Sequence, residues 1–198
     1  MPAATARPPG RRAGATRDEV VDAAVHRYLR GQRVDVQAIA AELGLGRTTI
    51  YRWFGSRDVL LGEVLARATD PVIDAARADA PGRGGRALLA TFDRLNRTLA
   101  AAPALRTFVE NERDAALRVI TSGAAFLQPH MVARIAGLIE AEVSAGLYEP
   151  PVEVETLAYA IVKLAEAFLF NDAAAGMRGD VDRLREVEAA LLGVRGTR

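Results

Sequence analysis

Apolar residues recur three and four positions apart along most of this 198-residue chain, which is the spacing of an amphipathic helix. No stretch alternates apolar and polar residues for long enough to indicate a β-strand, and runs of β-branched residues are rare. Glycine or proline stands at most of the breaks between the periodic segments. The pattern therefore predicts an all-α protein.

The first two helices are predicted from their end signals. Thr16, followed three residues later by Glu19, has the spacing of a capping box, and Gly31 is a typical residue after the end of a helix. Asp35 is the expected N-cap of a short second helix, which ends at Gly44. Residues 1–15 contain mainly Pro, Gly, Ala and Arg, which predicts a disordered arm.

A tight turn at Gly44 separates the second helix from a short third one. The third helix is predicted to start near Arg47 and to end at Gly55. Ser56 then caps a fourth helix, Arg57 to about Thr69. Two short helices joined by a glycine-containing turn indicate a helix-turn-helix.

A loop at residues 81–85 precedes the rest of the chain, which is also helical by pattern. The predicted helices are Arg86–Ala102, Ala104–Glu110, Glu112–Thr121, Gln128–Ala145, Glu153–Ala175 and Asp180–Leu192. Pro129 is expected in the first turn of its helix, where a missing N–H is harmless. We therefore divide the chain into an arm (1–15), a helix-turn-helix domain (16–61) and a larger helical domain (62–198).

The second helix of a helix-turn-helix enters the major groove, so its solvent-facing side chains contact DNA. The candidates are Arg47, Thr48, Thr49, Tyr51 and Trp53, whereas Ile50 and Phe54 are expected in the core. The alternative is a structural helical bundle whose surface side chains have no binding role. The aromatic pair Tyr51 and Trp53, predicted to be exposed, favours a binding role.

The stretch from Ile39 to Leu61, IAAELGLGRTTIYRWFGSRDVLL, resembles the DNA-binding signature of the TetR family, and the resemblance covers about residues 16–65. It implies a homodimer that binds a palindromic operator and is usually released by a small ligand. It also implies DNA contacts from Gln37 and from Arg57, the latter at a helix N-terminus near a phosphate. Gly46 departs from the pattern, because the family commonly has a hydroxyl residue there to cap the recognition helix.

Three stretches of the larger domain (residues 111–118, 128–129 and 158–163) resemble regulators associated with the degradation of lactone quorum-sensing signals. This implies a lactone-like or other apolar small-molecule inducer. Inward-facing aromatic residues and isolated polar groups are the candidate pocket residues, with ordinary core or surface positions as the alternative. They are Phe92, Leu95, Asn96, Phe108, Asn111, Phe126, Arg134, Ile135 and Phe168.

The predicted helix Glu153–Ala175 is apolar on both sides, so both sides require burial. A partner subunit covers the second side most simply, and the last helix adds apolar positions of its own, including Leu184 and Val187. We therefore expect a homodimer through the last two helices. Burial within one monomer is the alternative.

Charge and composition narrow the function further. Residues 1–60 contain ten arginines against six acidic residues, whereas the remainder is net acidic, which favours a polyanion partner for the first part. The chain has no cysteine and two isolated histidines, and it lacks a phosphate-binding glycine motif. We therefore expect no enzyme and no cofactor. No signal peptide or membrane span is predicted, so we expect a cytoplasmic protein. A transcriptional regulator is the expected function, and the alternative is a dimeric adaptor or ligand-binding protein that does not bind DNA.

Overall fold

The structure, a computed structural model, describes residues 14–122, 126–171 and 179–194, and within these ranges all regular structure is helical. The elements are α1 (Arg17–Leu29), α2 (Val36–Glu42), α3 (Arg47–Phe54), α4 (Arg57–Ala78), α5 (Gly84–Ala101), α6 (Pro103–Asn111), α7 (Arg113–Thr121), α8 (Leu127–Ser144), α9 (Val154–Glu166), the π-helical turn η1 (Ala167–Asn171) and α10 (Val181–Leu191). The all-α prediction is confirmed. Most of the predicted arm (residues 1–13) and residues 172–175 of the long predicted helix lie outside the described ranges.

The predicted helix starts agree with the observed caps. The Thr16 hydroxyl accepts from the Glu19 amide (3.2 Å) while the Thr16 amide donates to the Glu19 carboxylate (2.6 Å), which completes the capping box. Asp35 accepts from the amide of Gln37, and Ser56 caps α4. These local bonds account for the agreement, because each involves residues only two or three positions apart.

Helix α4 is longer than predicted, because it continues through Pro71 to Ala78. A proline inside a helix removes one hydrogen bond and costs about 3 kcal/mol. Pro71 lies on the exposed side of α4, whereas Ile73 and Ala76, further along the helix, are buried in the core. Burial of this last stretch offsets the cost of the proline, so tertiary packing determines where α4 ends.

The helix predicted from Glu153 also differs from the observed one. After Glu166 the α-helix widens into the π-helical turn η1. The amide of Gly179 donates to the carbonyl of Phe168 in this turn (2.7 Å). A single π-turn in an α-helix is frequent at functional sites.

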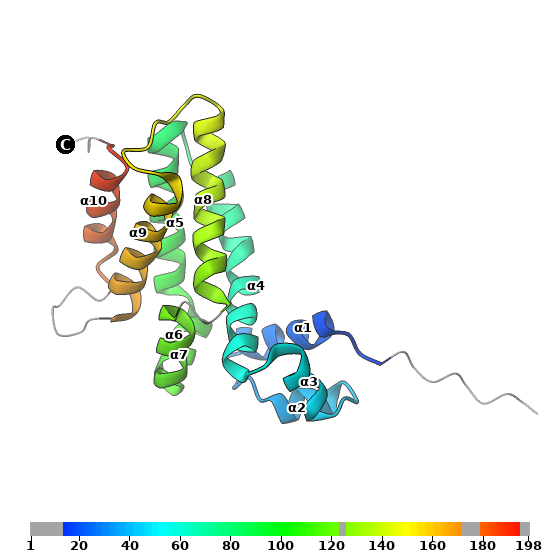
Figure 1. The fold of residues 1–198 in the computed structure, drawn as a ribbon. Coiled ribbons are helices and arrows are strands. Elements are labelled where there is room, and N and C mark those ends of the chain that lie inside the picture. The colour runs from blue at the N-terminus through cyan, green and yellow to red at the C-terminus, as the bar shows by residue number, and fades with distance from the viewer. Residues whose placement is uncertain (1–13, 123–125, 172–178, 195–198) are drawn as a thin grey trace, which may run out of the picture.

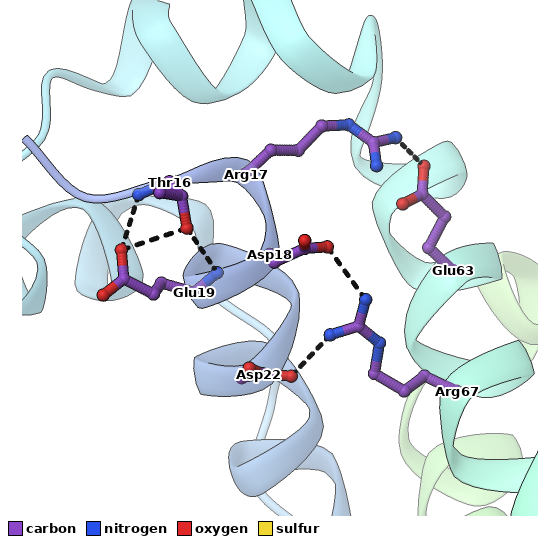
Figure 2. A network of polar contacts seen from close by, with 7 residues as sticks. All are labelled: Thr16, Arg17, Asp18, Glu19, Asp22, Glu63 and Arg67. Carbon is purple, nitrogen blue, oxygen red and sulfur yellow. Dashed lines mark hydrogen bonds and ion pairs between the residues drawn. The ribbon is translucent and has the colours of Figure 1, made fainter.

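Helices α1, α2 and α3 form a small unit that we call the head (Figure 1). Its core is shared with the start of α4 and with α6, α7 and α8, and it includes Val20, Ile39, Ile50 and Phe54. Ion pairs between α1 and α4 reinforce this packing, as Figure 2 shows: Arg67 contacts Asp18 (3.0 Å) and Asp22 (2.6 Å), and Arg17 pairs with Glu63. These ion pairs connect α1 to the first three turns of α4.

Helices α5, α8, α9 and α10 pack with the outer part of α4 into a bundle around a second buried cluster (Figure 1). This cluster includes Ile73, Phe92, Ile135 and Leu157. Helices α6 and α7 lie at the end of the bundle that faces the head. No helix in the described ranges is long and apolar enough to cross a membrane.

Candidate DNA-binding face and ligand cavity

The turn between α2 and α3 has the geometry that a helix-turn-helix requires. Gly44 has φ +65°, a left-handed conformation that glycine adopts without strain. Gly46 caps α3 without any side-chain hydrogen bond, and its carbonyl accepts from the amide of Thr49 (2.9 Å). The recognition helix therefore starts through backbone geometry alone, as the absence of a hydroxyl side chain at Gly46 requires.

Four of the predicted DNA-contact residues line one shallow groove on the head. Gln37 from α2, Arg47 and Tyr51 from α3 and Arg57 from α4 surround a volume of about 160 Å³. The Arg47 guanidinium lies over the Tyr51 ring, 5.9 Å from its centroid. Arg33, which the sequence analysis missed, also lines this groove. The arrangement places several hydrogen-bond donors on one face, as a phosphate backbone requires.

The other three candidates lie on the same helix with different exposures. Thr48 is exposed and Thr49 is half-buried. Trp53 is only partly exposed and packs against the core of the head, so the prediction of an exposed aromatic pair is correct for Tyr51 and wrong for Trp53. The Trp53 indole therefore helps to cover the apolar core at the end of α3.

Arg57 is engaged within the protein. Its Nε donates to the carbonyl of Val34 (2.9 Å), and its Nη2 lies 2.7 Å from a carboxylate oxygen of Glu112. Arg33 reaches the same carboxylate at 3.5 Å. Glu112 lies between α6 and α7, so this ion pair connects the groove on the head with the end of the bundle. The sequence carried no signal for it, because the two partners are 55 residues apart.

The bundle contains an apolar cavity of about 80 Å³. Four of the predicted pocket residues line it: Phe92, Leu95, Asn96 and Ile135. The remaining lining residues come from helices on every side, namely Tyr28, Leu65, Thr69, Leu99, Leu105, Ile120, Leu127, Gln128, Met131, Ile161, Val162, Ala165, Glu166, Leu169, Phe170 and Glu188. The mixture of an apolar wall and a few polar groups is typical of a small-molecule site.

The polar groups of the cavity wall include an amide and a carboxylate that sequence reasoning missed. Glu188 of α10 is fully buried, and its Oε1 accepts a hydrogen bond from Asn96 of α5 (2.9 Å). Burial raises the pKa of Glu188 to about 7, and Asp93 adds to the effect, while the bond from Asn96 opposes it. Gln128, in the first turn of α8, is also buried.

The other predicted pocket residues lie away from this cavity. Phe108 and Asn111 line a wider groove between the head and α6 and α7. Phe126 is 42% exposed and stacks on His130, with ring centroids 5.5 Å apart. Arg134 pairs with Asp70 and Asp74 of α4 instead, because α8 presents it outward to that helix. Phe168 is half-buried, and its neighbours Leu169 and Phe170 reach the cavity in its place.

The cavity also touches the head directly. Tyr28 of α1 lines it, packs edge-on against Phe108 of α6 (ring centroids 6.2 Å apart) and has its pKa raised strongly by burial. Leu65 and Thr69 of α4 line the same wall. A molecule in the cavity would therefore contact both α4 and the first helix of the head.

A helix-turn-helix head on a helical bundle is the architecture of a class of protein, the DNA-binding regulators. Residues 83–193 match the family profile described as "Tetracyclin repressor-like, C-terminal domain". The match covers more than half of the chain, and the chain therefore belongs to the TetR family of transcriptional regulators. Proteins of this family are transcription factors and not enzymes. No curated protein sequence matches the chain.

Among solved structures, the fold is similar to that of the transcriptional repressor QsdR from R. erythropolis. The two chains share 27% sequence identity with a TM-score of 0.83, over 92% of this chain and 96% of QsdR. Bacillus subtilis FadR in complex with stearoyl-CoA (14% identity, TM-score 0.46, 91% of this chain and 100% of FadR) and Thermus thermophilus PfmR (18%, 0.42, 91% and 98%) are more distant. QsdR therefore provides the informative structural comparison.

Proposed function

We propose that this protein is a homodimeric repressor that binds a palindromic operator through α3 and leaves it when a small apolar molecule fills the cavity of the bundle. The observation that carries the DNA-binding part is the groove on the head, where Gln37, Arg47, Tyr51 and Arg57 converge. Repression as the mode of action is supported by the similarity to QsdR, which is described as a transcriptional repressor.

We assign residues 16–61 to DNA binding and residues 62–198 to ligand binding and dimerisation. The dimer is proposed to form through α9 and α10. Tyr159 of α9 is 52% exposed and Val187 of α10 is 38% exposed, although both are large apolar residues on a helix surface. A second copy related by a two-fold axis would cover both, and would hold two recognition helices one DNA turn apart, roughly 34–36 Å.

The switch is proposed to act through α4. A ligand that fills the cavity displaces Leu65 and Thr69 of α4 together with Tyr28 of α1. The ion pairs of Arg67 with Asp18 and Asp22 transmit any tilt of α4 to the head. A tilt in each protomer changes the separation of the two heads, so the form that fits the operator is depopulated.

An apolar ligand is supported by the wall of the cavity. Two of the three stretches that resemble regulators of lactone degradation contribute Gln128, Ile161 and Val162 to that wall. A lactone-like molecule is therefore one candidate inducer, and the operator itself is expected upstream of the protein's own gene.

The test of DNA binding uses a labelled fragment of that upstream region and measures affinity over a range of salt concentrations. The logarithm of the affinity is expected to fall linearly with the logarithm of salt concentration, with a slope of about −0.9 per phosphate contact. Arg47→Ala is expected to reduce discrimination for the operator over unrelated DNA by about 1–3 kcal/mol.

The matched control is Arg86→Ala. It removes the same charge near the start of α5, at the far end of the 22-residue α4, roughly 33 Å from the head. It is expected to leave operator affinity close to that of the wild type. Absent or salt-insensitive binding would instead favour the second candidate function, a dimeric ligand-binding adaptor that never contacts DNA.

A further inference from the structure

Two buried polar atoms at the cavity have no hydrogen-bond partner among the described residues: Nε2 of Gln128 and Oε2 of Glu188. The two side chains line the cavity and are only 6% and 0% exposed. Buried polar groups of native proteins are nearly always paired, so two unpaired ones in the wall of one cavity indicate that something else completes them. A bound molecule with a polar group would do so.

The chemistry of the two atoms is complementary. The Gln128 amide nitrogen can only donate. Oε1 of Glu188 already accepts from Asn96, and above the pKa of about 7 the carboxylate is ionised, so its free Oε2 can only accept. A ligand group that satisfies both must therefore present an acceptor to Gln128 and a donor to Glu188. A primary amide or a hydroxyl group does this, and a simple carboxylate does not.

The charge around the cavity points in the same direction. Two carboxylates line it, Glu188 and Glu166, and the lining residues in the described part of the chain include no arginine, lysine or histidine. Glu166 is paired with Lys163 (2.7 Å), so the cation beside this carboxylate is already engaged. Asp93 lies close enough to Glu188 to influence its ionisation. Among the lining residues that the structure describes, an anionic ligand would therefore meet two acidic groups and no cation.

We infer that the cavity recognises a small uncharged molecule with an apolar body and one head group that both donates and accepts hydrogen bonds, and that it rejects anions. Gln128 and Glu188 are the residues that select the head group. The claim that such a molecule is the inducer rests on the function proposed above. The binding preference itself can be measured on the protein without DNA.

The size of the cavity limits the apolar body. A cavity needs about 10–15 Å³ to hold one water molecule, so about 80 Å³ accommodates a body of roughly five to eight heavy atoms. Hexanamide, hexanoate and hexylammonium have the same six-carbon skeleton and differ only in the charge and bonding of the head group. They are suitable probes for that reason.

The experiment measures the dissociation constant of each probe for the full-length protein by isothermal titration calorimetry at pH 8, where hexanoate is ionised. Hexanamide is expected to bind at least tenfold more tightly than hexanoate. Hexylammonium, which can donate to Glu188 but cannot accept from Gln128, is expected to lie between them. Equal or tighter binding of hexanoate or of hexylammonium than of hexanamide overturns the inference, and so does the absence of binding by all three probes.

Variants assign the selection to the two residues. Glu188→Gln removes the negative charge with little change in shape, and is expected to reduce the preference for hexanamide over hexanoate to below threefold. Gln128→Leu is expected to weaken hexanamide at least fivefold. The matched control is Glu186→Gln, which removes a charge from an exposed position of the same helix and should leave the preference unchanged. An unchanged preference in Glu188→Gln contradicts the assignment.

The outcome of this experiment is separable from that of the proposed function, because the titrations contain no DNA. If hexanamide binds selectively but operator affinity is unaffected by it, the ligand switch fails and the specificity stands. If the protein binds its operator and a molecule bearing a carboxylate occupies the cavity and releases it, the repressor stands and the specificity is refuted. Crystals grown with hexanamide would show directly whether its amide meets Gln128 and Glu188.

Discussion

Glu112→Gln is expected to strengthen operator binding, because the Glu112 carboxylate competes with DNA phosphate for Arg57. In the structure Arg57 lies at the edge of the groove on the head, and its guanidinium contacts Glu112 at 2.7 Å. Glutamine keeps the length of the side chain and removes its charge. Arg57 would then be available to a phosphate at no electrostatic cost.

The expected magnitude follows from the burial of the pair. The Arg57 side chain is 21% exposed and that of Glu112 is 15% exposed. Fully exposed pairs contribute about 0.2–1 kcal/mol, and breaking a fully buried pair costs about 3–5 kcal/mol. An intermediate value of about 1–2 kcal/mol per head corresponds to a five- to thirtyfold gain in affinity for each head. The salt dependence should steepen by up to about 0.9 per phosphate gained.

Fluorescence anisotropy with labelled operator at several salt concentrations measures both quantities. Glu110→Gln is the matched control, because it removes the same charge from an exposed position two residues earlier on α6. It should produce only the small change expected from long-range attraction. An unchanged slope in Glu112→Gln, or an equal gain in Glu110→Gln, would refute the proposed competition for Arg57.

Three further predictions concern stability and assembly. Gly84→Ala should lower the free energy of unfolding by about 2–5 kcal/mol in urea titrations, because Gly84 has φ +63° and a Cβ there would overlap the carbonyl of Leu147. The control is Gly82→Ala, where φ is +82° and the space is open, and it should lower the free energy of unfolding by only about 1–2 kcal/mol. Burial in the folded protein raises the pKa of Glu188 from 4.5 to about 7. The free energy of unfolding of the wild type should therefore fall relative to that of Glu188→Gln by on the order of 3 kcal/mol as pH rises from about 4.5 to 7. A constant difference between the two proteins over this range would contradict the burial effect. Tyr159→Asp should shift the protein from dimer to monomer in sedimentation experiments, and a dimer of unchanged stability would place the interface elsewhere.

The head could be predicted from sequence because its signals are local. Asp35 and Gly44 each define a helix end through bonds or dihedral angles within a few residues of chain. The core positions Ile50 and Phe54 follow from helical spacing alone, and both are buried as predicted. The error at Trp53 arose because exposure of one residue on a short helix depends on how far the neighbouring helices cover it.

The cavity was predictable only in part, because it depends on which helices meet. Phe92, Leu95, Asn96 and Ile135 were identified from inward-facing positions. Glu188 was missed because a glutamate on an amphipathic helix is usually solvent-facing, and its partner is 92 residues away in sequence.

Arg134 illustrates the opposite error. Its isolated polar character within an apolar helix was interpreted as a ligand contact, but it pairs with Asp70 and Asp74 on α4. Asp74 lies on α4 because this helix continues past Pro71, whereas the sequence predicted that the helix would end near Thr69.

The central claim, a dimeric repressor that reads DNA through α3, is tested most directly by footprinting the protein on the DNA upstream of its own gene. We predict protection of an inverted repeat whose half-sites are separated by a whole number of helical turns, and loss of this protection in Arg47→Ala but not in Arg86→Ala. Protection that is unaffected by Arg47→Ala, or no protected sequence at all, would contradict the account.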